Sequence, residues 1–163
     1  MIKFPDAEGL RPTPGRVRET LFNWLGQTLY GRTCLDLFAG SGALGFEAAS
    51  RGAERVVMVE SNPAVCRALK ENLETFKCAN VFVHCQDGLE FISRDALQYD
   101  VIFLDPPFSG DHLPRLLEIL PKHLSEKGLL YLESGSPAEA TQPWKVVKSG
   151  KAGQVYFNLL AIG

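Results

Sequence analysis

Short apolar runs alternate with amphipathic stretches along most of the chain. The runs that predict strands cover residues 33–38, 55–60, 81–85, 101–105, 129–133, 144–148 and 155–162. Two of them, at 56–59 and 101–104, are continuously apolar, which is typical of strands covered on both faces of a parallel sheet. Alternation of such strands with helices predicts an open, doubly wound α/β sheet.

Between these runs, apolar residues recur at the spacing of an α-helix. The clearest helix opens at Asn62-Pro63, an N-cap followed by proline at the first helical position. Its apolar positions recur at helical spacing and predict one buried stripe of Val65, Ala68, Leu69, Leu73 and Phe76. Further helices are expected after 13–14, from about 41 to 52, and after 111. A short glycine-containing link between the last two strands predicts an antiparallel hairpin.

A glycine-rich turn follows the first predicted strand. It reads Ala39-Gly40-Ser41-Gly42 and leads into the next helix, whose free N–H groups would face a ligand. Glu60 closes the second strand, where a carboxylate can accept hydrogen bonds from both hydroxyls of a ribose. Together they predict a site for a nucleoside-containing cofactor; a structural turn beside an exposed glutamate is the alternative.

The glycine spacing fits a dinucleotide fingerprint as well, with Glu60 near its expected acid position. Asp36, within the strand before the loop, favours a different cofactor. A carboxylate would repel a pyrophosphate but would favour the cationic sulfonium and amino-acid tail of S-adenosylmethionine. Asp87, after the third strand, is an acceptor for an adenine amino group or else a turn aspartate.

The most specific pattern is Asp105-Pro106-Pro107-Phe108, directly after the fourth strand. Two prolines fix the backbone and lack N–H groups, so the turn offers mainly acceptors, namely the Asp105 carboxylate and the Pro106 carbonyl. Two adjacent acceptors suit an exocyclic –NH2 group and can turn its lone pair toward a methyl donor. Phe108 can stack on a base taken out of its helix. A rigid turn with an aromatic plug is the alternative.

Composition and charge narrow the possibilities. The chain has 163 residues, which suits one domain covering 1–163, and no apolar run approaches the ~20 residues of a membrane span. The first residues lack a signal-peptide core, so we expect a cytoplasmic protein. Net charge is −2, but residues 1–32 and 144–163 are basic and the middle is acidic, so a polyanion would be steered to the ends.

Cysteine and histidine spacing predicts neither a metal site nor a disulfide framework. The cysteines form no CxxC pair and the histidines are scattered. Disulfides are rare in a reducing cytosol. Cys34 and Cys85 lie in apolar segments, where we expect free thiols that pack as small hydrophobic groups.

These motifs resemble the class I methyltransferases that carry an (Asp/Asn)-Pro-Pro-(Phe/Tyr/Trp) motif. Residues 9–14 and 16–25 resemble the opening of the bacterial 16S ribosomal RNA guanine-N2 methyltransferases, and 36–45, 105–108 and 152–155 continue the match. The resemblance implies a Rossmann-like, mostly parallel sheet of seven strands with the last antiparallel and helices on both faces. It implies methyl transfer from S-adenosylmethionine to N2 of a guanine in the small ribosomal subunit or its assembly intermediate. The expected product is S-adenosylhomocysteine, and the enzyme is expected to be a monomer.

The resemblance also implies residue roles. Asp36 and the loop would face the methionine part of the cofactor, Glu60 the ribose and Asp87 the adenine. The full set expected at the cofactor is Asp36, Phe38, Ala39, Gly40, Ser41, Gly42, Glu60, Ser61, Asp87 and Gly88. Asp105, Pro106, Pro107 and Phe108 would hold the guanine as the catalytic group. Within a helical, substrate-side segment 1–32, the residues expected to order the site or touch RNA are Arg11, Thr13, Arg16 and Arg18.

Two departures and three rival functions accompany this interpretation. Family members usually begin with a basic Gly/Arg-rich segment that is not seen here, which predicts weaker RNA affinity. Gly15 replaces a common acid and would loosen the first helical turn. The rivals are an adenine-N6 methyltransferase on DNA or RNA, a nicotinamide-dependent oxidoreductase, and a catalytically inactive RNA-binding module.

Overall fold

The computed structural model describes residues 15–105, 113–136 and 141–163. Its helices are α1 (Gly15–Leu25), α2 (Ala43–Ser50), α3 (Pro63–Phe76), α4 (Gly88–Arg94), α5 (Leu113–Ile119) and the 3-10 helix η1 (Leu120–His123). Its strands are β1 (Thr33–Asp36), β2 (Arg55–Glu60), β3 (Val81–Cys85), β4 (Tyr99–Leu104), β5 (Leu124–Ser134), β6 (Trp144–Ala152) and β7 (Val155–Ile162).

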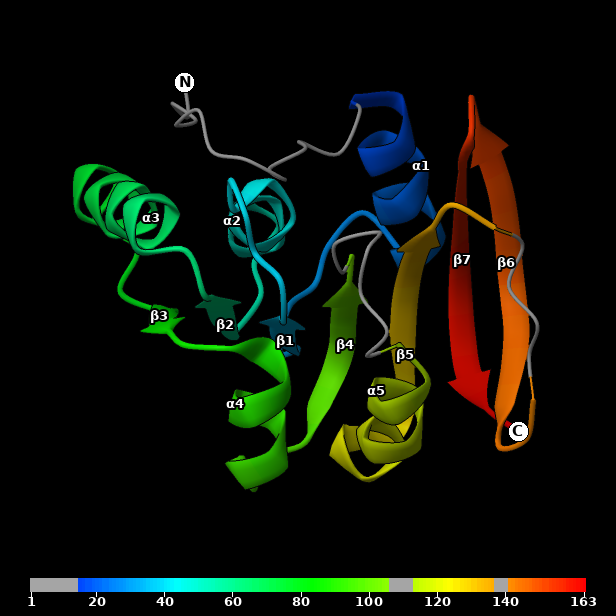
Figure 1. Ribbon diagram of the computed structural model, residues 1–163. Helices are drawn as coiled ribbons and strands as arrows, with labels where there is room; N and C mark the ends of the chain where they lie inside the picture. The colour runs from blue at the N-terminus through cyan, green and yellow to red at the C-terminus, as the bar shows by residue number, and fades with distance from the viewer. Residues whose placement is uncertain (1–14, 106–112, 137–140) are drawn as a thin grey trace.

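In this part of the chain, all strands belong to one seven-stranded sheet of order β3-β2-β1-β4-β5-β7-β6 (Figure 1). The first five in that order pair in parallel, whereas β7 pairs antiparallel with both β5 and β6. The predicted doubly wound sheet with a reversed last strand is confirmed, and so is the terminal hairpin. The chain leaves β1 toward β2 and β3, then returns to place β4 on the other side of β1, so the order reverses between β1 and β4.

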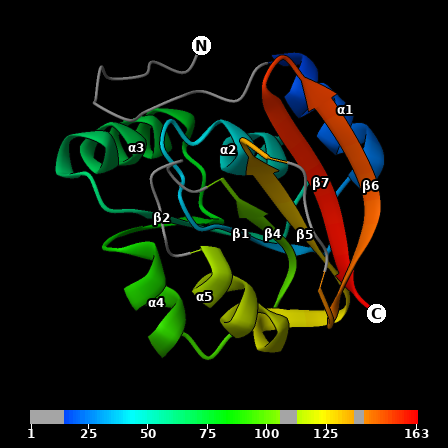
Figure 2. The ribbon, with the colours of Figure 1, turned by 45° about the vertical axis from the view of Figure 1, so that its right-hand side comes forward.

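Helices cover both faces of the sheet (Figures 1 and 2). On one face α1, α2 and α3 pack on alternate strand residues such as Cys34, Met58 and Phe103. On the other face α4 and α5 pack on the intervening positions, for example Leu35 and Ile102. Because successive residues of a strand point to opposite faces, the continuously apolar run 101–104 of β4 contributes to both cores.

Local sequence explains where α3 begins. Asn62 Oδ1 accepts hydrogen bonds from the Ala64 and Val65 backbone N–H groups at 3.0 and 3.1 Å, and proline occupies the first helical position. The predicted stripe is confirmed at its centre, but it is wrong at Phe76, which is 41% exposed. Phe76 is the last helical residue, and its ring meets the Phe46 ring edge-on at 6.2 Å.

Other boundaries differ from the sequence-based prediction. Helix α2 begins at Ala43 rather than near Ser41 because the glycine turn occupies the positions before it. Strand β6 extends further than its apolar run, since an edge strand in a hairpin tolerates polar residues. Strand β5, inside the sheet, begins at Leu124 rather than 129, before an irregularity in its pairing with β4. The seven-residue α4 had not been predicted; its signal was the Asp87 N-cap.

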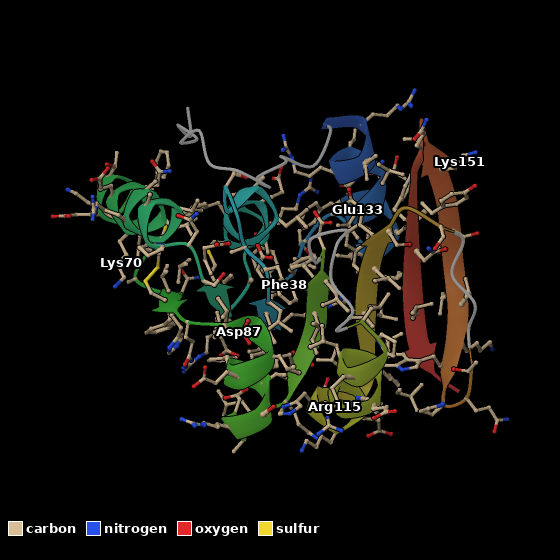
Figure 3. The ribbon with its side chains drawn as sticks, viewed as in Figure 1. Phe38, Lys70, Asp87, Arg115, Glu133 and Lys151 are labelled. Atoms are coloured by element: carbon tan, nitrogen blue, oxygen red, sulfur yellow. A yellow bond between two sulfur atoms is a disulfide. The ribbon has the colours of Figure 1, made fainter. Side chains whose placement is uncertain are left out.

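The prediction of free cysteines is wrong for one pair. Cys66 of α3 and Cys85 of β3 form a disulfide with Cα atoms 5.9 Å apart, visible in Figure 3 as a yellow bond. The helix runs back over its own following strand, which brings residues 19 positions apart into contact. Cys85 is exposed rather than buried. Cys34 is a buried free thiol as expected, and burial followed by the Asp100 charge raises its pKa to about 12.

None of the helices in the described ranges is long and apolar enough to cross a membrane. The described residues also contain no group of three or more His, Cys, Asp or Glu side chains placed to hold a metal ion.

Candidate active site

Acidic side chains gather at one edge of the sheet, formed by the carboxyl ends of the five strands that pair in parallel. Asp36 and Glu60 end β1 and β2, Asp87 follows β3, Asp105 follows β4, and Glu133 lies at the end of β5. Open α/β sheets bind ligands outside this edge, above all where the strand order reverses. Here that point lies between β1 and β4, which places the glycine turn beside Asp105.

The turn itself is a tight backbone structure. Gly40 and Gly42 have φ of 55° and 82°, in the left-handed region that favours glycine. The Gly42 N–H donates to Ala39 O at 2.8 Å, and the Ala39 N–H donates to Val59 O at 2.9 Å. Ser41 is buried, and its hydroxyl oxygen accepts the Ala43 N–H at 3.3 Å, which holds the start of α2. The loop is therefore shaped by the backbone.

Glu60 joins this turn to the start of α3. Its Oε1 accepts the Gly40 N–H and its Oε2 accepts the Asn62 N–H, each at 2.9 Å. A carboxylate has about four lone-pair positions, so both oxygens retain acceptor capacity on the half-buried side chain. The predicted contact of Glu60 with a ribose stays a prediction. Ser61, between Glu60 and Asn62 in the sequence, is exposed.

Asp36 lies beneath the turn and is 3% exposed. Its Oδ2 accepts the Gly45 N–H at 3.2 Å, which fastens β1 to the first turn of α2. Burial, opposed by that hydrogen bond and assisted by the Glu60 charge, raises the pKa of Asp36 to about 7. A cation bound over the turn would favour the charged form. The expected contact with a methionine tail is a proposal taken up below.

Phe38 and Gly88 close the adjoining part of the edge, near Asp87 (Figure 3). A Cβ built on Gly88 would lie 3.0 Å from both Leu37 O and the Phe38 ring, so glycine permits this close approach. Asp87 is exposed and caps α4, its Oδ2 accepting the Glu90 N–H at 3.0 Å. The hydrogen bond to Glu90 uses Oδ2 of Asp87. The expected contact of Asp87 with an adenine stays a prediction.

Asp105 is the described member of the Asp-Pro-Pro-Phe sequence; Pro106, Pro107 and Phe108 lie outside the described residues. It directly follows β4 and is half-buried. Phe103 is the register partner of Asp36, so Asp105, two residues further on, is level with Phe38. The geometry thus brings the predicted amine acceptor next to the predicted cofactor turn.

A buried pair beside Asp105 was missed by the sequence reasoning. Tyr131 Oη donates to Glu133 Oε2 at 2.8 Å, and Glu133 is 5% exposed. Burial first, then the Glu133 charge and hydrogen bond, then the Asp105 charge raise the pKa of the Tyr131 phenol. The signal was present, because Glu133 ends an apolar strand in the same way as Asp105.

Of the N-terminal residues expected to contact RNA, the structure describes Arg16 and Arg18. Arg11 and Thr13 lie outside the described residues, whereas Arg16 is exposed on the first turn of α1. Arg18 pairs with Glu47 of α2, with Nε and Oε1 3.7 Å apart. Helix α1 begins at Gly15 and packs into the core that it shares with β4 and β5, so the glycine is compatible with the helix.

The strand order, the reversed β7 and the glycine turn before α2 define the class I methyltransferase fold. A ribosomal protein L11 methylase from Lactobacillus delbrueckii subsp. bulgaricus has this fold at a TM-score of 0.75 over 89% of this chain and 77% of that chain, and 18% identity limits the likeness to the fold. The Escherichia coli protein yhhF is more similar, with a TM-score of 0.86, 38% identity, and coverage of 96% of this chain and 89% of that one.

Sequence comparison gives the particular family. Residues 1–161 match the model of the family described as Conserved hypothetical protein 95, and the chain belongs to that family. It is 40% identical to the Ribosomal RNA small subunit methyltransferase D of Escherichia coli strain K12, over 97% of this chain and 82% of the relative.

Proposed function

We propose that this protein transfers a methyl group from S-adenosylmethionine to the N2 amine of a guanine in 16S ribosomal RNA of the small subunit. The observation that carries the proposal is Asp105, an acceptor beside the glycine turn at the reversal of strand order. The name of the Escherichia coli relative supports a small-subunit rRNA substrate, and the family resemblance supports the guanine N2 position.

The residues at the turn fit a cationic nucleoside cofactor. The turn is built on the positive φ of Gly40 and Gly42, and Asp36 beneath it gains stability as a carboxylate when a cation is near. Glu60 and Asp87 supply acceptors for ribose hydroxyls and an adenine amine. Phe38 follows β1, the strand that separates β2 from β4 and so separates Glu60 from Asp105 in the order of the sheet. When bound, S-adenosylmethionine supplies an electrophilic methyl group on its sulfonium and leaves as S-adenosylhomocysteine.

Asp105 prepares the amine of the substrate. The lone pair of an exocyclic amine is delocalised into the base, so the amine is a weak nucleophile. An acceptor that holds an N–H bond turns the lone pair out of conjugation, and a carboxylate stabilises the positive charge that the nitrogen gains as its new N–C bond forms. As the N–C bond forms, the bond between sulfur and the methyl carbon breaks, and the nitrogen then gives up one proton to Asp105 or to water. Pro106, Pro107 and Phe108 are proposed to complete this pocket through a carbonyl acceptor and a stacking ring.

The RNA is proposed to contact basic residues away from the acidic edge. Arg16 is exposed on α1, Arg18 orders α1 against α2 through Glu47, and Arg11 and Thr13 belong to the same segment. We take residues 1–163 as one domain, with 1–32 on the substrate side, that acts as a cytoplasmic monomer on the subunit or an assembly intermediate.

The test is methyl transfer from radiolabelled S-adenosylmethionine to small ribosomal subunits from cells lacking the activity, followed by nucleoside analysis. Asp105→Ala is the test variant. Asp100→Asn is the matched control, because Asp100 lies on the same strand at the opposite edge, where it accepts the Thr33 N–H. Label in N2-methylguanosine that is lost with Asp105→Ala alone supports the proposal. Label in N6-methyladenosine refutes the guanine assignment, and cofactor binding without transfer to any base refutes catalysis.

A further inference from the structure

The outer strand β6 carries positive charge that no acid in its part of the sequence offsets. Residues 144–163 contain three lysines and no aspartate or glutamate. The three, Lys145, Lys148 and Lys151, all lie on β6 and are exposed. Strand β6 ends the order of the described sheet, and none of the ion pairs among the described residues involves these lysines. Their ammonium groups are therefore available to an anionic partner.

An irregularity in β6 brings two of the lysines to the same face of the sheet. On a regular strand, residues three apart point to opposite faces. Here two consecutive residues of β7 pair with Val146 and Lys148, which leaves Val147 as an extra residue in β6. Lys145 and Lys148 therefore project on the same side. That side is the side of α1, because Leu159, the partner of Lys148, belongs to the core under α1.

Helix α1 packs against the hairpin of β6 and β7 on this side (Figure 1). The Trp24 ring stacks on the Phe157 ring of β7, with ring centroids 5.3 Å apart. Gly150 of β6 is the register partner of Phe157, and a Cβ built on it would lie 2.5 Å from that ring, so glycine makes room for the stack. Exposed Arg16 thus belongs to an element on the same side of the sheet as Lys148.

Lys151 lies at the end of β6 nearest the candidate active site. It pairs with Tyr156, which pairs in turn with Ser134, the last residue of β5. Two strand spacings of about 4.8 Å therefore separate Lys151 from the acidic edge at β5. Figure 3 shows Lys151 at this end of β6. Its ammonium group lies 5.0 Å from the centre of the Tyr156 ring, an attraction that orients the group and leaves it N–H donors for a ligand.

We propose that β6 holds the backbone of the RNA whose base enters the candidate active site, with Lys145, Lys148 and Lys151 as phosphate contacts. This proposal rests on the proposed function and adds the surface that binds its polyanionic partner. The acidic edge repels phosphates, so the backbone needs a positive surface outside that edge. An ammonium group binds a phosphate as a point charge. Lysines and a bulge also keep edge strands of two molecules from pairing, and the salt dependence of binding separates the two roles.

The test measures the dissociation constant for small ribosomal subunits from cells lacking the activity, over a series of KCl concentrations at constant Mg²⁺. The test variant replaces the three lysines of β6 with alanine, and a second variant replaces them with arginine, which keeps the charge. The matched control replaces exposed Arg67 and Lys70 of α3 and Lys122 of η1 with alanine. Helix α3 lies beside β3, at the other end of the strand order. Thermal unfolding and S-adenosylhomocysteine affinity verify the fold and the cofactor site of each variant.

The expected result is a change in slope. Binding to phosphates releases counterions, so log Kd varies linearly with log salt concentration, by about 0.7–0.9 per phosphate contact. Loss of the lysine contacts should reduce this slope by about 2 and weaken binding at least ~10-fold at low salt. The arginine variant and the control should keep the slope of the wild type.

An unchanged slope in the alanine variant overturns the proposal. If affinity falls without a change in slope, β6 contacts a protein of the subunit by strand pairing. If affinity is also unchanged and the variant self-associates, the lysines only protect the edge of the sheet. Methyl transfer is followed separately by nucleoside analysis. A wild-type protein that methylates no guanine refutes the proposed function, whereas the slope still decides whether β6 binds RNA, so the two failures are distinguishable.

Discussion

Asp36→Asn should make the stability of the protein less dependent on pH. The folded-state pKa of about 7 exceeds the ordinary value of 3.8 by about three units. At about 1.4 kcal/mol per unit, ionising the buried carboxyl costs up to ~4 kcal/mol. Between pH 4 and 7 the unfolded chain releases this proton while the folded protein keeps it, so rising pH favours unfolding. Above about pH 8 the folded protein is ionised too, and this dependence levels off. Asparagine retains an acceptor for the Gly45 N–H but has no charge.

The assay is urea unfolding at pH 5, 6, 7 and 8, followed by the fluorescence of Trp24 and Trp144. The unfolding free energy of the wild type minus that of Asp36→Asn should fall by about 2–3 kcal/mol from pH 5 to pH 8. Taking the difference between the two proteins cancels the other titrating groups. Glu126→Gln, which removes an exposed carboxylate on β5, is the matched control for the loss of one acidic group. A flat difference for Asp36→Asn would refute the reasoning from burial.

Three further predictions concern the turn, the helix start and the basic edge. Gly42→Ala should cost about 1–3 kcal/mol of unfolding free energy and weaken S-adenosylhomocysteine binding in calorimetry, because φ is 82° and a Cβ would come within 2.6 Å of a neighbouring side chain. Gly15→Ala, where nothing lies within 4 Å, should be nearly neutral in both measurements. Asn62→Ala should lower the unfolding free energy by about 1 kcal/mol in urea titrations through loss of the α3 cap. Lys148→Glu, on the exposed edge strand β6, should raise KM for small subunits several-fold at low salt, an effect that added salt reduces. Lys127→Glu, near the start of β5 and so at the end of the sheet away from the acidic residues, should not show it.

Sequence patterns predicted the sheet well because its strands are distinctive. Apolar runs such as 101–104 belong to strands covered on both faces, and the Asn62-Pro63 start of α3 has a specific hydrogen-bonding reason. The short α4 was missed because seven residues carry too little periodicity to separate a helix from a loop. The Cys66–Cys85 disulfide was missed because proximity across a helix and its following strand depends on packing that spacing does not reveal.

For the candidate site, sequence predicted which residues reach the edge better than what they contact there. Glu60 and Asp36 lie at the turn as expected, but each also holds a backbone N–H of the protein itself. A motif shows that an acceptor is needed and leaves open whether protein, ligand or both supply the donor. Glu133 escaped notice because a lone glutamate at a strand end has no motif around it; its neighbour in space, Asp105, is 28 positions away in the chain.

The uneven charge of the sequence acquires a structural meaning at this edge. The acids that end the five parallel neighbours all come from the acidic middle of the chain, and they surround the place where a ligand would bind. An edge rich in carboxylates would repel a pyrophosphate, which argues against a nicotinamide dinucleotide, and it attracts cations and N–H donors. It would equally repel an RNA backbone, so the polyanion must be held elsewhere while a single base enters. Exposed basic residues that could hold the RNA backbone include Arg16 on α1 and Lys148 on the edge strand β6. The same charge distribution therefore favours a cationic cofactor, an amine substrate and a nucleic-acid partner together.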